Sequence, residues 1–122
     1  ENACTSFEFK KMFDAEAVDY AQPSVTKVGG ITEFKKISSL ADNYGVQVMP
    51  HSPYFGPGFL ATLHLAQSMP NPGLLERFFI DFEAYLYPEK IFNPKDGFFE
   101  ISEEVGLGLD PDINVIKDYS VK

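Results

Sequence analysis

Four side chains able to carry charge or exchange protons stand close to the ends of short apolar runs: Glu1, Ser24, His51 and Glu76. They offer a hydroxyl, an imidazole and two carboxylates, the groups used for general acid–base chemistry near neutral pH. A Ser-His-carboxylate triad is disfavoured, because no G-x-S-x-G elbow surrounds Ser24 and spacing alone establishes no triad. His51 is either a proton-transfer residue or a strand-end histidine bonded for packing, whereas His64, inside an apolar helix, is predicted to be structural.

Glu76 and a glycine pair carry two further hypotheses. Glu76 lies in a largely apolar stretch, where an unpaired carboxylate is costly to bury. We therefore expect it to face a polar cavity or to pair with Arg77 or a lysine. The Gly29–Gly30 pair could bring backbone N–H groups to an anion at the start of a helix, in which case the chain would be an open α/β binding module.

The elements that position these side chains alternate along residues 1–79. Apolar residues at helical spacing predict helices over 5–16, 31–44 and 59–68. Short apolar runs predict strands over 18–22, 46–49 and 74–78. The strand ends recur roughly every 28 residues, which predicts an α/β fold with parallel strands, right-handed connections and outer helices. A whole (β/α)-barrel needs ~250 residues, so the chain is either a small open sheet or part of a barrel.

Local signals mark the helix ends. Thr5 and Glu8 form a capping-box pattern at the start of the first helix. Gly45 is expected just beyond the end of the second helix, where glycine accepts a left-handed conformation. Residues 80–122 break the alternation and predict an irregular tail with a hairpin-type strand over 97–102. A last helix is expected through Tyr119, with Asp110 as its N-cap.

Composition excludes several classes of protein. The chain has 122 residues, enough for one small domain, and a net charge of −8. That charge argues against nucleic-acid and anionic-membrane partners, and no apolar run approaches the ~20 residues of a membrane span. A single cysteine, Cys4, excludes an internal disulfide framework and favours a cytoplasmic location. The first residue is Glu1 rather than Met, which we interpret as a sign of processing or of a longer parent chain.

Several motifs in order carry a resemblance that covers nearly the whole chain. They are "VDYAQPSVTKVGGITEFKKISSLADNYGVQVMPHS", "TLHLAQSMPN", "LLER" and "GLGLDPD". The sequence resembles the mandelate racemase and muconate-lactonizing branch of the enolase superfamily, in the C-terminal part of its (β/α)-barrel domain. The resemblance implies that residues 1–79 are late βα units of the barrel. It also implies that residues 80–122 are a tail that packs on a capping domain.

The resemblance also implies a chemistry: magnesium-dependent removal of the proton α to the carboxylate of a small acid. Matched residue by residue, Glu1 is similar to a metal ligand and His51 to the catalytic histidine. Glu76 is similar to the acid that hydrogen-bonds the substrate carboxylate, and Tyr54 and Phe55 would line the substrate pocket. The family's other metal ligands and its lysine base would precede Glu1, so these 122 residues alone are expected to be inactive.

One departure from the family pattern concerns Ser24. Racemase-like members carry an aspartate there to orient the histidine, whereas epimerase- and cycloisomerase-like members carry a lysine. Serine supplies no negative charge, so the resemblance favours an acid-sugar dehydratase over a racemase, with His51 as the acid for the leaving hydroxyl. We expect Ser24 to take part in catalysis, with His51 nearer to it than to any carboxylate on the neighbouring strand. The alternative is a non-catalytic domain kept for packing or assembly.

A last expectation concerns association. A partial barrel leaves two sheet edges and an inner face uncovered, and such surfaces pair readily with other chains. We therefore expect a homo-oligomer.

Overall fold

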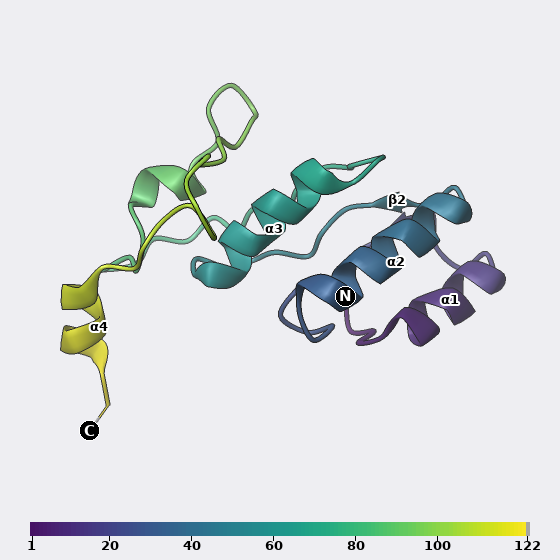
Figure 1. Cartoon of the computed structure of the whole chain (residues 1–122), viewed down its shortest axis with the longest axis horizontal. Helices are drawn as coiled ribbons and strands as arrows, with labels where there is room; N and C mark the ends of the chain where they lie inside the picture. The colour runs from purple at the N-terminus through teal and green to yellow at the C-terminus, as the bar shows by residue number, and fades with distance from the viewer. Residues whose placement is uncertain (122) are drawn as a thin grey trace.

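The computed structural model describes residues 1–121 and contains four α-helices, two short strands and one 3₁₀-helix. The elements are α1 (Ser6–Asp14), β1 (Tyr20–Ala21), α2 (Ile31–Asn43), β2 (Gln47–Val48), α3 (Pro57–Ser68), η1 (Glu89–Phe92) and α4 (Ile113–Tyr119). Helix α1 lies at one end of the long axis and α4 at the other (Figure 1). Within residues 1–121, every helix is too short or too polar to cross a membrane.

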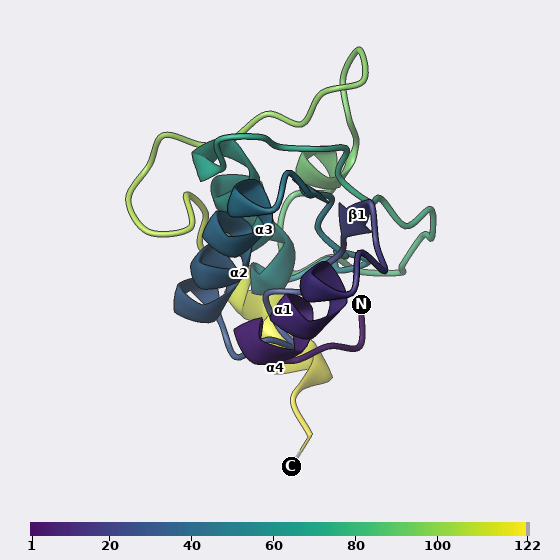
Figure 2. The ribbon, with the colours of Figure 1, turned by 90° about the vertical axis from the view of Figure 1, so that its right-hand side faces the viewer.

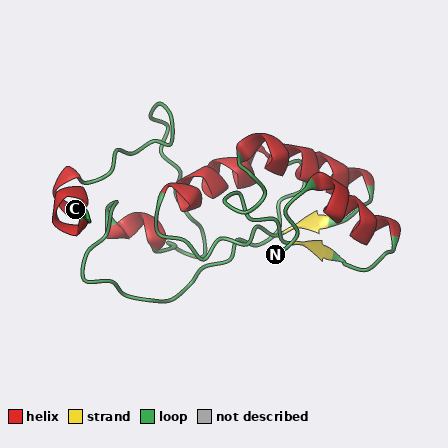
Figure 3. Cartoon of the chain, turned by 90° about the horizontal axis from the view of Figure 1, so that it is seen from below, coloured by secondary structure: helices red, strands yellow, loops and turns green. Residues whose placement is uncertain are grey.

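The parallel pairing predicted for the first two strands is confirmed. β1 pairs with β2 in parallel, Tyr20 opposite Gln47 and Ala21 opposite Val48. Helices lie on one side of this pair, as expected for βα units (Figure 3). The pairing continues past the strands, because Met49 N–H donates to the Ala21 carbonyl at 2.8 Å. The carboxyl ends of β1 and β2 are thereby held together.

The third predicted strand, 74–78, is wrong. What forms instead is one parallel bridge earlier in the chain, where Gly73 N–H donates to the Val48 carbonyl at 2.9 Å. Successive residues of a strand direct their backbone groups to opposite neighbours, so residue 50 would have to donate the next bond to the 72–74 segment. Pro50 has no N–H, and the ladder stops there. The segment beyond it carries exposed side chains, including Leu74 and Phe79.

The predicted helices form, with small shifts at their ends. The capping box of α1 is present, with Thr5 Oγ1 accepting from Glu8 N–H and the Glu8 carboxylate accepting from Thr5 N–H. After α2, Gly45 has a φ of 68°, the left-handed conformation expected of a residue beyond a helix end. Helix α3 begins two residues earlier than predicted, because Pro57 fits the first helical turn, where its missing N–H costs nothing.

Two apolar clusters hold the chain together. The first is centred on α2, which lies between α1 and α3 (Figure 2). It includes the fully buried side chains of Phe34, Ile37 and Ala41. The second joins the tail to α3 and consists of Phe59, Leu60, Leu63, Tyr87 and Phe92. The irregular tail is therefore anchored on the helix that follows the strand-end loop.

Two details predicted for the tail are wrong. Residues 97–102 form no strand beyond one antiparallel bridge, between Lys95 and Phe98, which closes a tight turn. The turn places Gly97 at a φ of 84°. The N-cap of α4 is Asp112 rather than Asp110, because the Asp112 carboxylate accepts a hydrogen bond from Asn114 N–H at 2.8 Å.

Candidate active site

The paired strand ends bring the predicted histidine to the carboxyl edge of the sheet. His51 N–H donates to the Pro23 carbonyl at 3.1 Å, which extends the β1–β2 pairing by one more bond. Pro23 and Pro50 are both fully buried, so the backbone on either side of the edge is fixed. In parallel α/β folds this edge is where functional side chains gather.

His51 lies against two carboxylates. Its Nδ1 is 2.6 Å from Glu76 Oε2 and 3.1 Å from Glu1 Oε2, and neither carboxylate is aligned for a hydrogen bond with it. The imidazole is only 12% exposed and Nδ1 is inaccessible to water. Negative oxygens at these distances favour the form of the imidazole that carries its proton on Nδ1. The other ring nitrogen, Nε2, is left to exchange protons.

Glu76 is held in place by the backbone of the strand-end loop. Its Oε2 accepts a hydrogen bond from Ser52 N–H at 3.1 Å, beside the contact with His51. Of the alternatives expected for Glu76, pairing with Arg77 does not occur. The Arg77 guanidinium instead stacks 4.3 Å from the Phe79 ring and donates to the Phe92 carbonyl at 2.9 Å. Arg77 is thus attached to the end of η1, and the Glu76 carboxylate contacts His51 rather than Arg77.

The expectation that His51 lies nearer to Ser24 than to a carboxylate of the neighbouring segment is wrong, because the closest polar contact of the imidazole is with Glu76, at 2.6 Å. Ser24 is fully buried, but its hydroxyl lies 2.6 Å from the Tyr54 hydroxyl and 3.0 Å from that of Thr26. The carboxylate of Glu76, which follows the neighbouring bridged segment, lies beside the imidazole instead. Sequence patterns gave no signal for the Tyr54 contact, because it depends on the course of the loop after His51.

The two aromatic residues predicted for the substrate pocket point to different surroundings. The Tyr54 ring meets the His51 ring edge-on, with centroids 6.3 Å apart and planes at 79°. Phe55 packs in an aromatic cluster with Phe82 and Phe92, at centroid distances of 4.9 and 5.2 Å. Tyr54 therefore adjoins the histidine directly, whereas Phe55 joins the site to the tail.

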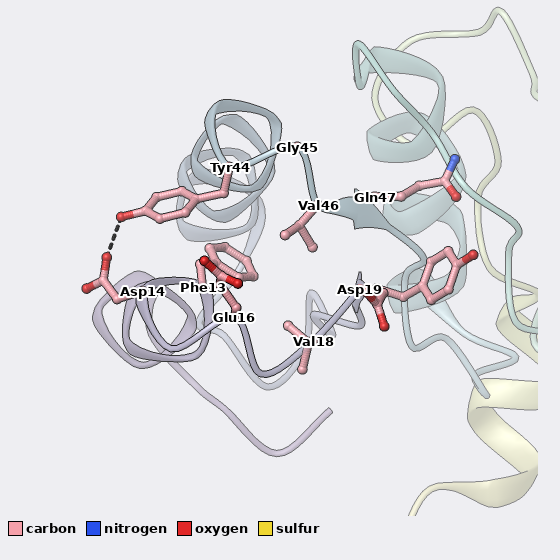
Figure 4. A pocket seen from close by; sticks show the side chains of 10 residues that line it. Phe13, Asp14, Glu16, Val18, Asp19, Tyr44, Gly45, Val46 and Gln47 are labelled. Carbon is pink, nitrogen blue, oxygen red and sulfur yellow. Dashed lines mark hydrogen bonds between the residues drawn. The ribbon is translucent and has the colours of Figure 1, made fainter.

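A hollow lies at the opposite ends of the strands. It has a volume of about 740 Å³ and is lined from α1, the end of α2 and the starts of β1 and β2 (Figure 4). The Tyr44 hydroxyl donates to Asp14 at its rim. Its lining includes neither His51 nor Glu76, so the candidate site is not in this hollow.

The donor groups of residues 1–121 do not by themselves fit a magnesium site. No group of three His, Cys, Asp or Glu side chains in this part of the chain is arranged to hold a metal ion. Glu1, the predicted metal ligand, has a side chain 49% exposed and lies against His51. Glu1 could supply at most part of the six-oxygen shell that Mg²⁺ takes, several of whose ligands are water.

Comparison with known proteins identifies the family. The family model described as enolase C-terminal domain-like matches residues 1–115. The chain belongs to this family. Its α/β fold, with parallel strands and outer helices from the C-terminal part of the family's barrel, agrees with that membership.

The chain is similar to several individual members of this family. D-xylonate dehydratase of Haloferax volcanii is 29% identical over 125 residues, which cover all of this chain and 30% of that protein. The mandelate racemase/muconate lactonizing enzyme structure from Sulfitobacter sp. is 33% identical with a TM-score of 0.82, covering 97% of this chain and 30% of that one. L-talarate dehydratase from Polaromonas sp. JS666, complexed with Mg and L-glucarate, is 33% identical with a TM-score of 0.56, covering 64% and 20%. The chain thus spans less than a third of the curated relative.

Proposed function

We propose that these residues form the histidine side of the active site of an acid-sugar dehydratase of the enolase superfamily. The observation that carries the proposal is the contact between the buried His51 Nδ1 and the partly exposed Glu76 carboxylate at the carboxyl edge of the strands. Two relatives are dehydratases of sugar acids by name. A small carboxylic acid with hydroxyl groups on both its α- and β-carbons is therefore the proposed substrate.

In the proposed reaction, His51 acts as the general acid. A base elsewhere in the enzyme removes the proton α to the substrate carboxylate, which gives an enediolate. His51 Nε2 then gives its proton to the β-hydroxyl as the carbon–oxygen bond breaks, so that water leaves and an enol remains. The enol takes up a proton to become the 2-keto acid. A general acid of this kind contributes ~10²–10⁴-fold to the rate.

Glu76 has two roles open to it in this proposal. Its negative charge beside Nδ1 stabilises the protonated imidazole and orients the ring so that Nε2 faces the substrate. When a substrate binds, the same carboxylic group could also hydrogen-bond the substrate carboxylate, as the family resemblance implies. The first role follows from the geometry of residues 51–76, and we give it precedence.

The identity of residue 24 bears on the choice of reaction. Racemisation by two opposed bases needs a histidine with a dedicated carboxylate partner that makes it a strong base. Ser24 supplies none, and its hydroxyl is engaged by Tyr54 and Thr26. The Glu76 carboxylate lies beside the imidazole instead and would stabilise its protonated form in either reaction, so the preference for dehydration rests on the dehydratase names of two relatives.

Mg²⁺ is the proposed cofactor, with Glu1 as one of its ligands. The support is the magnesium in the L-talarate dehydratase complex and the oxygen donor of Glu1, which Mg²⁺ prefers. The remaining ligands would come from outside residues 1–121.

The rest of the proposal concerns surroundings and assembly. The tail, 80–122, is proposed to pack on a capping domain. Exposed apolar side chains in the 74–82 segment support a homo-oligomer: Leu74, Phe78, Phe79, Ile80 and Phe82. A cytoplasmic location is proposed because Cys4 is a free, exposed thiol, and the acidic net charge of −8 disfavours nucleic acid and anionic membranes as partners.

The experiment is a product assay on the longest natural chain that contains these residues, supplied with Mg²⁺ and a panel of six-carbon and five-carbon sugar acids. Dehydration yields a 2-keto-3-deoxy acid, which a carbonyl reagent detects, whereas racemisation changes optical rotation without a new carbonyl. We expect the keto product from at least one acid. Optical inversion without keto product would overturn the proposal in favour of a racemase, and the absence of both reactions would favour a non-catalytic domain.

A further inference from the structure

A chain of three hydroxyl groups runs from the end of β1 to the loop that carries His51. We call Thr26, Ser24 and Tyr54 the hydroxyl chain: Ser24 Oγ lies 3.0 Å from Thr26 Oγ1 and 2.6 Å from the Tyr54 hydroxyl. Ser24 is fully buried, and a buried hydroxyl is costly when it lacks a partner. The Ser24 hydroxyl therefore holds the Tyr54 phenol in one place.

Packing around the hydroxyl chain leaves little freedom for the loop. A Cβ atom on Gly58, at the start of α3, would come within 2.7 Å of Thr26 Cγ2 and 3.6 Å of Tyr54 Cδ2. Glycine at this position is what lets the first turn of α3 lie against Thr26. On the other side, His51 N–H is bonded to the Pro23 carbonyl. The segment from His51 to Gly58 is thus attached to residues 23–26 at both of its ends and at Tyr54.

Tyr54 transmits this attachment to the histidine. Its ring meets the His51 ring edge-on at 6.3 Å, an arrangement that aromatic rings favour. The Glu76 carboxylate contacts the same imidazole at Nδ1. The imidazole is therefore held by a carboxylate at one nitrogen and by the Tyr54 ring beside it.

We infer that Ser24 is a positioning residue that acts on His51 through Tyr54. The catalytic importance of that positioning rests on the function proposed above, but the positioning itself does not. The Ser24 hydroxyl is bonded to Thr26 and Tyr54 and makes no hydrogen bond to His51 in the described chain, and the Tyr54 ring that it fixes meets the His51 ring. Residue 24 thereby sets the orientation of the imidazole, while Glu76 supplies the charge.

The test uses carbon–proton NMR spectra of the 122-residue chain labelled on its histidines. The chain has two histidines, so His64 is an internal reference for His51. The variants are Ser24→Ala, Tyr54→Phe and the double variant. The matched control is Ser38→Ala, since Ser38 is a buried serine on α2, 7% exposed. An aromatic ring shifts the resonances of nearby protons, so any movement of the Tyr54 ring changes the ring C–H signals of His51.

The inference predicts that each single variant moves the His51 signals and that the double variant moves them no further than the larger single change. The His64 signals should stay in place, and Ser38→Ala should move neither. Unmoved His51 signals in Ser24→Ala would overturn the inference, as would shifts of the two single variants that simply add. Far-UV circular dichroism verifies folding, and Ser24→Cys, which keeps the buried volume, replaces Ser24→Ala if the alanine variant unfolds.

This experiment separates the inference from the proposed function because it needs no turnover. Non-additive His51 shifts together with an inactive whole protein would keep the positioning role and overturn the dehydratase. Active enzyme with His51 signals unmoved in Ser24→Ala would do the reverse.

Discussion

The contact between His51 and Glu76 can be measured by replacing His51 with Asn and Glu76 with Gln, singly and together. The two atoms lie 2.6 Å apart, and the side chains are 12% and 37% exposed. A hydrogen bond to a charged group contributes about 1.5–3 kcal/mol when well aligned, whereas an exposed ion pair contributes about 0.2–1 kcal/mol. Because Glu76 is more than a third exposed and the contact is off-axis, we expect a coupling free energy of about 1 kcal/mol.

The assay is urea-induced unfolding of the four proteins at one slightly acidic pH, with the coupling taken from the double-mutant cycle. Gln at residue 76 retains an oxygen that can accept from Ser52 N–H, so the cycle isolates the charge beside the imidazole. The control cycle pairs Glu76→Gln with His64→Asn, a histidine on α3 that makes no ion pair with Glu76 in the described chain. We expect the control to be additive within about 0.5 kcal/mol. Additivity in the His51 cycle as well would refute the contact.

Three further predictions concern stability. Phe34→Ala, at a fully buried position in the α2 core, should lower the free energy of unfolding by about 3–5 kcal/mol in urea titrations. Gly73→Ala should also destabilise the chain and weaken amide protection near the bridge, because its Cβ would lie 2.9 Å from the Val48 carbonyl oxygen. The hydrogen bond from Ser6 N–H, with smaller help from Lys36, lowers the pKa of Glu33 to about 2. This folded-state pKa lies below the ordinary glutamate pKa of 4.5, so the contribution to stability is present above pH 4.5 and is lost as the pH falls toward 2. Glu33→Gln should lower the free energy of unfolding at neutral pH. It should also make that free energy less dependent on pH between about 2 and 4.5.

The parts of the fold that sequence predicts well are those specified by local residues. The Thr5–Glu8 capping box, the helices and the glycine after α2 depend on neighbours within a few positions, and all are present. The roughly 28-residue repeat was enough to predict parallel pairing of the first two strands. The third predicted strand, 74–78, does not form. Its pairing would need a backbone N–H donor at residue 50, and Pro50 has none.

The candidate site likewise combines features that the sequence predicts with contacts that it does not. Strand ends predicted which residues gather at the carboxyl edge, and His51 and Glu76 do meet there. Their partners could not be predicted, since the contacts of Ser24 and Tyr54 are set by the path of an irregular loop. The serine at residue 24 indicated that the histidine lacks the carboxylate partner of racemase-like members, and nothing in the pattern of residues showed that Glu76 would lie beside it.

The central claim, that His51 is the acid for the departing hydroxyl, is tested most directly by His51→Asn in the longest natural chain containing these residues. Two rates are measured on the same sugar acid in deuterated water: exchange of the α-proton and formation of the keto product. Because the base lies elsewhere, the account predicts that α-proton exchange persists while keto-acid formation falls by ~10²–10⁴-fold. Equal loss of both rates, or keto-acid formation at the unaltered rate, would contradict it.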